Sequence, residues 1–547
     1  GFTRKSSRVK RRNTTNWHSS SVPIVATNRC CRRRYCCVRF LLGKMKVATI
    51  MATALGVCAR IHAEEQQLAW SSTMNDGPDP ALKEMTYDIG DGEKTFMAYV
   101  EPDVTSFYAE DPPSSTRVVP KFTGLASKFI NLSKDNIRLY WEAHENAEPN
   151  LIRNFPPFNA GGTASFPGHR FFFATDTDPF ERLESYLVGE YPENLYVYDP
   201  YKVEGDPEQT EANLEGLNMV EKTMYLQWDK TLKFNDHYFN FTGRTYLANY
   251  MRPAPEHFMW RADHFGQQHW VTSKETHFVD IPSRELTAPV PSSPKDRILK
   301  PEDKRILSEY RDPDQGLLNM TLTVLSCAPR VFEIQNFLSP AEVQHIMELA
   351  GQIDLKESTT GDVGQEVKEV DFEEQKKRKT RTSKNSWVER ERSLIVDAIY
   401  RRAADVMRID EAKLRRRDAS EYPEMKSKNT IAEALQLVHY DKTQEYTAHH
   451  DFGYTKIEDM DHGARFATLL LYLNDVEMGG ETSFPRWVNA ETFQGLKVKP
   501  QTGKAVLFYS QLPDGNMDDF SQHAALPVLK GEKWLINLWV WDPVYGK

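Results

Sequence analysis

Cysteine is scarce over most of this 547-residue chain. Five of the six cysteines precede residue 64, and only Cys327 lies in the remainder. A single thiol cannot form an intramolecular disulfide, so residues 64–547 hold no disulfide framework in any compartment. Apolar runs are short as well. The run at 47–59 has 13 residues, whereas a membrane-spanning helix needs about 20, so we expect no stable membrane span.

Acidic residues are absent from the first 63 positions, which hold 14 of the 69 basic residues and none of the 78 acidic ones. We expect residues 1–44 to be a disordered basic leader. The rest of the chain carries 55 basic against 78 acidic residues, a net charge of −23. Phosphate backbones repel so acidic a body, which argues against nucleic acid as a partner.

Residues 45–63 have the pattern of a signal peptide. A positive start at Met45-Lys46 precedes the apolar run, and a small residue, Ala63, stands before the first acidic residues. The pattern predicts a mature protein that begins near Glu64 and enters the secretory pathway, either the endoplasmic reticulum or Golgi lumen or the exterior. An uncleaved signal anchor is the alternative. Three glycosylation sequons fit this route and predict a glycoprotein; they start at Asn131, Asn240 and Asn319.

The remaining chain divides into two regions with a joint between them. Residues 64–280 are rich in aromatic residues and in short apolar runs broken by Pro, Gly and Asn. This pattern predicts an N-terminal β-rich domain, small and sandwich-like. Residues 281–316 hold six prolines among many charges, which indicates a Pro-rich linker.

Residues 317–547 are predicted to form a second domain. A capping pattern at Ser339 begins one helix, and a second helix is expected over 387–407. The charged segment 352–380 is expected to be a surface loop. The clearest strands that follow are 435–440, 467–473, 505–509 and 534–541. Helices leading into many short strands indicate a double-stranded β-helix, or jelly roll. The predicted fold class is therefore mostly β with flanking helices (α+β).

Two histidines and an aspartate of this second domain are candidate metal ligands. In a strand, residues two apart face the same way, so His449 and Asp451 can present their side chains to one point while His450 faces away. A later strand can bring His523 to that point. Two histidines and one carboxylate, with open positions left on the metal, are the donor set of non-haem Fe(II) oxygenases. We expect replacement of His450 by alanine to have a mild effect.

Two further residues complete a candidate site. A cation near a metal-bound α-keto acid can pair with its far carboxylate, and Lys533 lies ten residues after His523. Tyr440, nine residues before His449, offers a hydroxyl to the same carboxylate. In isolation each residue has an ordinary reading, Lys533 as a surface lysine and Tyr440 as a half-buried strand residue.

Taken together, these residues resemble the prolyl 4-hydroxylase branch of the 2-oxoglutarate/Fe(II) dioxygenases. Six segments carry the resemblance in order: LQLVHY at 435–440, EYTAHHD at 445–451, RFATLLLYLNDV at 465–476, GGETSFP at 479–485, HAALPV at 523–528 and GEKW at 531–534. The family's substrate-side loop is matched by Arg381-Thr382-Ser383 and by Trp387. Two departures, the missing Gly before Gln444 and the long segment 352–380, bear on which peptide binds.

The resemblance implies a catalytic role for His449, Asp451, His523 and Lys533. It implies that the first three hold Fe(II), and that Lys533 and Tyr440 bind the far carboxylate of 2-oxoglutarate. Arg381 and Trp387 would lie near the peptide groove. Also implied are O₂ and ascorbate as cofactors, and a proline-containing peptide or protein as the substrate.

A second resemblance lies in residues 125–180. The segments NLS at 131–133, LYW at 139–141 and GGTASFPGHRFFF at 161–173 are similar to the β-domain of the von Hippel–Lindau protein. That domain recognises hydroxyproline, and Ser165 and His169 match its hydroxyl-contacting residues. Phe171 replaces a Trp of the family, and Ile152 stands where its groove has Tyr. The alternative is a simple hairpin in which Ser165 and His169 bind only local backbone.

Alternatives to prolyl hydroxylation stay open at this point. One is the same chemistry on another target such as peptidyl lysine. The other is a non-catalytic hydroxyproline-binding protein with an inactive barrel. The presence of suitable residues at all five metal and cosubstrate positions argues against an inactive barrel. The sequence gives no prediction of oligomeric state.

Overall fold

The structure is a computed structural model, and it describes residues 77–109, 122–145, 147–282, 309–358, 380–418, 420–425, 427–452, 463–488 and 494–543. The predicted leader and signal peptide lie outside these ranges. So do most of the predicted linker and most of the charged segment 352–380. The domain limits given above stay predictions.

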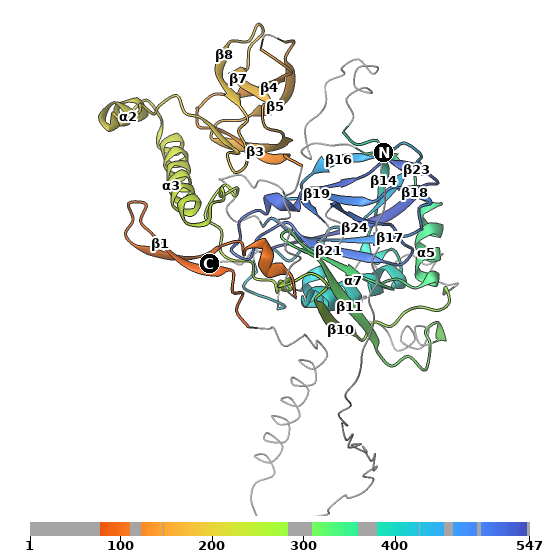
Figure 1. Cartoon of the computed structure of the whole chain (residues 1–547). Coiled ribbons are helices and arrows are strands. Elements are labelled where there is room, and N and C mark those ends of the chain that lie inside the picture. Colours follow the sequence, from red (N-terminus) through yellow and green to blue (C-terminus); the bar gives the residue numbers. More distant parts are fainter. Residues whose placement is uncertain are drawn as a thin grey trace, which may run out of the picture. The chain divides into compact units, whose positions relative to one another are not determined.

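A nine-stranded antiparallel sheet forms the larger layer of the barrel, and its first edge strand comes from the N-terminal region (Figure 1). In spatial order its strands are β10 (Gln268–Ser273), β11 (Leu318–Cys327), β12 (Arg330–Ile334), β21 (Ala505–Tyr509), β17 (Arg465–Tyr472), β24 (Lys533–Trp541), β15 (Leu435–Tyr440), β14 (Lys384–Val388) and β13 (Lys356–Glu357). The central strands are buried along nearly their whole length. A sheet buried on both faces must be covered by other layers.

A four-stranded sheet forms the second layer. Its spatial order is β16 (Tyr446–His449), β22 (His523–Ala525), β19 (Thr482–Val488) and β20 (Gly495–Val498). Apolar side chains of both sheets share one core, as Phe484 of β19 and Phe508 of β21 do with ring centroids 5.3 Å apart. Two antiparallel sheets packed in this way confirm the predicted jelly roll.

A two-stranded piece, β18 (Met478–Gly479) with β23 (Val528–Lys530), closes one edge of the barrel. Gly479 has φ +77°, and a Cβ there would lie 2.3 Å from the carbonyl oxygen of Pro527. Only glycine permits this conformation and this close approach of the two chains.

Helices α5 (Pro340–Ala350) and α7 (Leu394–Met407) pack against the larger sheet. The first was predicted correctly: the Ser339 hydroxyl accepts from the amide of Glu342, whose carboxylate accepts from the amide of Ser339. A buried ion pair joins the helices, because the Arg402 guanidinium donates to both carboxylate oxygens of Glu342 at 2.8 Å.

The start predicted for the second helix is wrong. Residues 384–388 form β14 and pair with β15, and the helix begins only after Ser393, whose hydroxyl caps it. Between them lies the 3₁₀ turn η3 (Arg390–Arg392). The apolar periodicity from Leu394 onward was correctly identified, but Trp387 favours a strand, and tertiary pairing decides its state.

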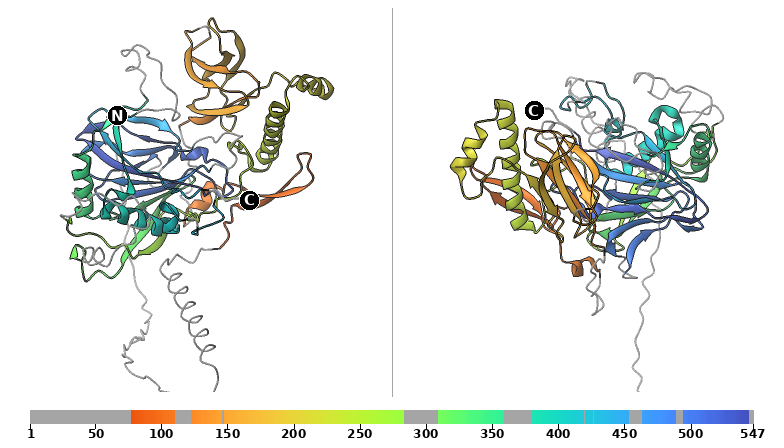
Figure 2. Two further views of the ribbon diagram at one scale, coloured as in Figure 1. Left: turned by 180° about the vertical axis from the view of Figure 1, so that it is seen from behind. Right: turned by 90° about the horizontal axis from the view of Figure 1, so that it is seen from above.

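Seven strands near the N-terminus form two further sheets, drawn in orange in Figures 1 and 2. One has the order β6 (Asn159–Ser165), β3 (Leu125–Asn131), β9 (Leu195–Tyr198); the other has β5 (Asn150–Phe155), β4 (Ile137–Glu142), β7 (Arg170–Thr175), β8 (Arg182–Leu187). Their facing sides share a core in which Phe129 packs on Phe171 and Phe173. This is the small β-sandwich that the sequence predicted.

The region 64–280 is not β alone, however. It also holds α2 (Pro207–Leu214) and the 24-residue helix α3 (Met219–Thr242). A capping box of Asn218 and Glu221 starts α3, and Gly243 at φ 72° ends it. The hairpin β1 (Leu82–Tyr87) and β2 (Lys94–Tyr99) packs on this helix. None of the described helices is at once long and apolar enough to cross a membrane.

The burial of Asn131 conflicts with its use as a glycosylation site. This residue is 0% exposed. Its Nδ2 donates to the carbonyls of Asp135 and Pro156 at 2.9 Å, and its Oδ1 accepts from the amide and the hydroxyl of Ser133. Asn240 and Asn319 are exposed. At Asn131 the sequon therefore stabilises a buried turn of the sandwich, and its side chain is not available to carry a glycan.

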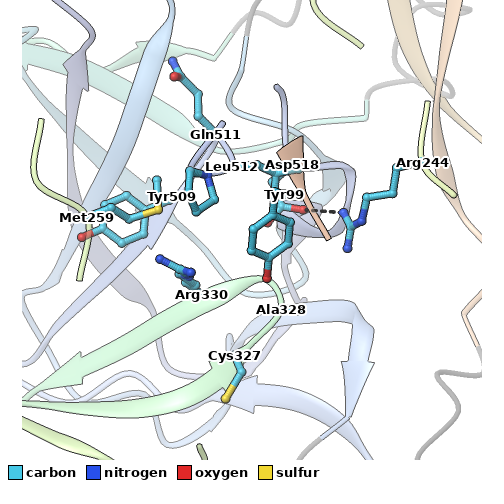
Figure 3. Close-up of a pocket in the computed structure, with 11 residues that line it drawn as sticks. Tyr99, Arg244, Met259, Cys327, Ala328, Arg330, Tyr509, Gln511, Leu512 and Asp518 are labelled. Carbon is cyan, nitrogen blue, oxygen red and sulfur yellow. Dashed lines mark ion pairs between the residues drawn. The ribbon is translucent and has the colours of Figure 1, made fainter. Parts of the chain in front are cut away.

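A small hollow lies where the N-terminal region meets the barrel (Figure 3). Its lining includes Tyr99 and Arg244 of the N-terminal region and Arg330 and Asp518 of the barrel. Its volume of about 10 Å³ holds about one water molecule, which is too small for a cosubstrate. Cys327 borders it too and is buried, which raises the pKa of its thiol.

Candidate metal centre

The three predicted ligands meet at the open edge of the smaller sheet. His449 of β16 and His523 of β22 are direct cross-strand partners. The Nε2 atoms of His449 and His523 lie 3.8 and 3.6 Å from oxygens of Asp451, and a set of ligand atoms from the three residues lies within 4.8 Å. Donors bound about 2.1 Å from one cation lie roughly 3–3.5 Å apart. The donor set and its spacing therefore fit a divalent metal.

Main-chain contacts fix the two imidazoles. Nδ1 of His449 donates to the carbonyl of Thr447 at 2.8 Å, and Nδ1 of His523 donates to the carbonyl of Ser521 at 3.1 Å. With the proton held on Nδ1, the lone pair of Nε2 is free for a metal.

The strand argument for this site holds only in part. Strand β16 ends at His449, so Asp451 lies beyond it rather than on it. His450 faces away from the centre, as predicted. It is not a free side chain, however, because its Nε2 donates to the carbonyl of Asp519 at 2.8 Å. A mild effect of its replacement therefore no longer follows.

Asp451 is oriented by residues that the sequence analysis did not identify. Its Oδ2 accepts from the hydroxyl of Thr468 at 2.7 Å and from Nε1 of Trp539 at 2.9 Å. Both donors lie on the larger sheet, so the ligand bridges the two layers. The sequence does contain a signal for Trp539. It stands six residues after Lys533, and residues an even number apart in a strand share a face, so Trp539 lies on the same face of β24 as Lys533.

The electrostatics keep all three groups in the form that binds metal. Burial, followed by the neighbouring His523, holds the pKa of His449 well below its usual range, and burial also lowers the pKa of His523. Burial alone would raise the pKa of Asp451, but His523 and His449, followed by Arg465 and the hydrogen bond from Trp539, bring it below the usual range. The imidazoles are therefore neutral and the carboxylate charged, as metal ligation requires.

Lys533 lies inside the barrel, and no ion pair joins it to another of the described residues. It is 0% exposed, and its Nζ has no hydrogen-bond partner among the described residues. Burial lowers its pKa to about 7. Such a buried, unpaired cation is costly unless an anionic group binds it, and it therefore marks a place for a ligand carboxylate.

Tyr440 stands beside this lysine. The two are cross-strand partners in β15 and β24, with Nζ 5.4 Å from the Tyr440 ring centroid. Burial raises the pKa of Tyr440, so its hydroxyl stays protonated and able to donate. The structure thus places both predicted cosubstrate residues together.

Each of the two predicted substrate residues packs against an aromatic ring that itself contacts a candidate metal ligand. The Arg381 guanidinium lies 4.7 Å from the ring centroid of Tyr446, which stacks on His449 at 3.5 Å. Trp387 is 45% exposed, and its ring lies 5.9 Å from that of Trp539, the residue that donates to Asp451.

Arg465 adds a cation to this surface. Its guanidinium lies 4.0 Å from the Trp539 ring centroid, and it pairs with Glu433 at 2.6 Å. The sequence analysis assigned it no role.

Ser165 and His169 lie in the sandwich and are not part of this centre. The Ser165 hydroxyl and Nδ1 of His169 are 3.3 Å apart. Ser165 is fully buried, whereas His169 is half-buried beside the rings of Trp141 and Phe166, at 5.8 and 5.3 Å. Burial lowers the pKa of His169.

Comparison with known proteins places the barrel among oxygenases. The model of the 2OG-Fe(II) oxygenase superfamily matches residues 435–541, which include all five metal and cosubstrate positions. Two relatives from Arabidopsis thaliana are each 33% identical to the chain. "Probable prolyl 4-hydroxylase 3" aligns over 40% of this chain and 71% of its own length, and "Probable prolyl 4-hydroxylase 8" over 42% and 74%.

A solved structure is similar as well. It is the viral collagen prolyl hydroxylase of Paramecium Bursaria Chlorella virus-1, in complex with 2OG. The identity is 22% and the TM-score 0.27, with 39% of this chain and 96% of that chain covered.

Proposed function

Because the chain belongs to the prolyl 4-hydroxylase family of 2-oxoglutarate- and Fe(II)-dependent dioxygenases, we propose that it hydroxylates prolyl residues in a peptide or protein. The observation that carries the proposal is the pairing of two features in one barrel. One is the convergence of His449, Asp451 and His523. The other is the buried, unpaired Lys533.

Fe(II) with 2-oxoglutarate supplies the oxidising chemistry that places a hydroxyl group on an unreactive C–H bond. His449, Asp451 and His523 would hold the iron on one side, which leaves positions open for the cosubstrate and O₂. The main-chain carbonyls of Thr447 and Ser521 keep both imidazoles turned toward it.

Lys533 would pair with the far carboxylate of 2-oxoglutarate, and Tyr440 would donate its hydroxyl to the same group. Neither residue is accessible to water, since their exposed fractions are 0% and 3%. A charge-assisted hydrogen bond is stronger in such a dry site than in water. This arrangement would select a dicarboxylate and hold it in one orientation.

The peptide would lie along Arg381, Trp387 and the rings next to them. Exposed tryptophan offers a flat apolar surface to a proline ring and an N–H to a peptide carbonyl. The buried Arg381 would act through Tyr446, whose ring rests on His449. We further propose that the protein works in the secretory pathway, as the signal-peptide pattern of 45–63 predicts.

The direct test is mass spectrometry of proline-rich and lysine-containing peptides. They would be incubated with protein 64–547, Fe(II), ascorbate and 2-oxoglutarate. We expect a gain of one oxygen on proline, absent in the His449→Ala variant. Oxidation of lysine alone would assign the alternative target. Absence of substrate-dependent succinate would leave the barrel without the proposed activity.

A second candidate function belongs to the sandwich: binding of hydroxyproline, the product of the first. The observation in its favour is the half-buried His169, held by Ser165 and bordered by two aromatic rings. Because Ser165 is fully buried, His169 would contact the ligand hydroxyl and Ser165 would orient its ring.

This second function is tested by titrating hydroxyprolyl and prolyl peptides of one sequence into the chain carrying His449→Ala, which cannot turn them over. We expect tighter binding of the hydroxyprolyl peptide, lost in the further variant His169→Ala. His144→Ala, an exposed histidine of the same sandwich, is the control. Equal binding of the two peptides would contradict the proposal.

A further inference from the structure

The segment 510–522 is buried although it holds only one short 3₁₀ turn, η6 (Asp519–Ser521). It leads directly into His523, one of the candidate iron ligands. Backbone amides of the N-terminal region bind its side chains: the amide of Tyr99 donates to Asp514, and the amide of Leu247 donates to Asn516. The N-terminal region therefore holds the segment that leads into the metal centre.

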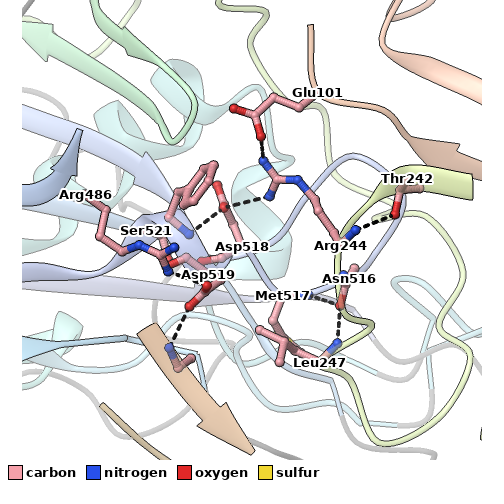
Figure 4. A network of polar contacts seen from close by, with 12 residues as sticks. Glu101, Thr242, Arg244, Leu247, Arg486, Asn516, Met517, Asp518, Asp519 and Ser521 are labelled. Carbon is pink, nitrogen blue, oxygen red and sulfur yellow. Dashed lines mark hydrogen bonds and ion pairs between the residues drawn. The ribbon is translucent and has the colours of Figure 1, made fainter. Parts of the chain in front are cut away.

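Asp519 connects this segment to the sandwich. Its Oδ1 accepts from the amide of Ala126, in β3 of the sandwich, at 2.8 Å. Its Oδ2 pairs with the Arg486 guanidinium of β19, as Figure 4 shows. Burial alone would raise the pKa of this carboxyl, but Arg486 holds it below its usual range. The charged group thus joins the sandwich to the barrel.

The main chain of the same residue binds the other ligand segment. The carbonyl of Asp519 accepts from Nε2 of His450 at 2.8 Å. His450 stands between His449 and Asp451 in the chain. The segments 449–451 and 519–523 together carry all three candidate ligands. Besides the pairing of β16 with β22, they are therefore connected outside the metal centre through His450 and Asp519, whose carboxylate also lies 3.4 Å from Nε2 of His450.

We propose that Asp519 is a positioning residue for the iron centre, which sets the spacing between the two ligand-bearing segments and makes that spacing depend on the N-terminal sandwich. The inference rests on the proposed function, because it takes His449, Asp451 and His523 as the ligands. Without the Asp519 carboxylate, the carbonyl that receives His450 loses the support of the Ala126 amide and of the Arg486 ion pair, and keeps only the longer bond from Arg486 at 3.3 Å. The distance between the ligands on segment 449–451 and the ligand His523 is then no longer fixed.

The test is a titration of the iron-free protein with Co(II), read from the visible absorption of the bound metal. No turnover is needed for this readout. Replacement of groups that orient metal ligands lowers metal affinity roughly 10- to 100-fold. We expect Asp519→Asn to weaken Co(II) binding by about tenfold or more and to change the absorption spectrum.

Glu342→Gln is the matched control. Like Asp519, Glu342 is a buried acid that pairs with an arginine and accepts from a backbone amide, here that of Phe278. It lies on α5, and among the described residues no hydrogen bond or ion pair joins it to either ligand segment. Both variants should lower Tm, but Glu342→Gln should bind Co(II) as the unaltered protein does. Equal weakening by both, or unaltered binding by Asp519→Asn, would overturn the inference.

A second pair of variants changes His450, the donor of the bond to the Asp519 carbonyl. These variants provide the test if Asp519→Asn does not fold. His450→Gln keeps a side-chain donor for the Asp519 carbonyl, whereas His450→Leu does not. We expect weak Co(II) binding with leucine and recovery with glutamine; normal binding with leucine overturns the inference. If His449→Ala binds Co(II) normally, the ligand assignment itself fails.

Discussion

His449 and His523 stand directly opposite one another in the antiparallel pair of β16 and β22, with ring centroids 4.4 Å apart. Opposed residues of such a pair project from the same face. The pairing register alone therefore brings together two ligands that lie 74 positions apart in the chain. A slip of one residue would turn one imidazole to the other face.

Removal of either imidazole should abolish metal binding. We expect His449→Ala and His523→Ala each to lower Co(II) affinity by more than about 100-fold, since even an orienting partner is worth roughly 10- to 100-fold. Substrate-dependent succinate release should disappear with it. The control is His144→Ala, on the surface of the sandwich. Normal Co(II) affinity in either ligand variant would contradict the assignment.

Lys533→Met should act on 2-oxoglutarate binding and on stability in opposite directions. Loss of a charge-assisted bond of about 1.5–3 kcal/mol should weaken cosubstrate binding roughly 10- to 100-fold. Tm should rise, because methionine fills the space without burying an unpaired cation. Lys530→Met, whose lysine side chain is 67% exposed, is the control and should change neither. A fall in Tm with unchanged binding would refute both expectations.

The affinity for 2-oxoglutarate should depend on pH through the same lysine. Burial lowers the pKa of Lys533 to about 7, so the free protein loses this positive charge as the pH rises above that value. The carboxylate binds the charged form, and affinity should therefore be flat below about pH 7 and fall by up to about tenfold per unit above it. Titrations in buffers of different ionisation enthalpy should show proton uptake on binding. The dependence should be absent in Lys533→Met.

Asn131 should carry no glycan in the folded protein and should contribute strongly to stability. Its carboxamide makes hydrogen bonds through both oxygen and nitrogen while fully buried. Asn131→Ala leaves those partners unsatisfied and should lower the free energy of unfolding by about 2–4 kcal/mol in urea titrations. Asn319→Ala removes an exposed side chain that accepts a hydrogen bond from the Thr272 hydroxyl, and it should change this free energy by less than about 0.5 kcal/mol.

The candidate site could be predicted from the sequence because each part of it has a local pattern. His449 and Asp451 stand two apart, and Lys533 follows His523 at a short, fixed spacing. The supports of Asp451 have no such pattern. Thr468 and Trp539 come from strands 17 and 88 residues away, and only the strand order of the larger sheet brings them to the carboxylate. Long-range pairing of this kind is not visible in one sequence.

Helix α3 shows a different reason for failure. Its buried residues include Tyr225, Trp228, Phe234 and Tyr238, aromatic residues that favour strands in composition. Their spacing of three to four residues is nevertheless helical. The Asn218 capping box and Gly243 gave matching start and stop signals. The aromatic composition predicts strands here, whereas the period of the buried residues agrees with the observed helix.

Cys327 is buried in β11, and its thiol pKa lies above the usual range because burial disfavours the thiolate. Alkylating reagents attack accessible thiolates. In protein that starts after residue 63, a cysteine introduced at the surface would therefore be the one that reacts. Glu181→Cys in the sandwich and Lys530→Cys in the barrel would accept a pair of spin labels. The distance between the two domains could then be followed by magnetic resonance with the native thiol left in place.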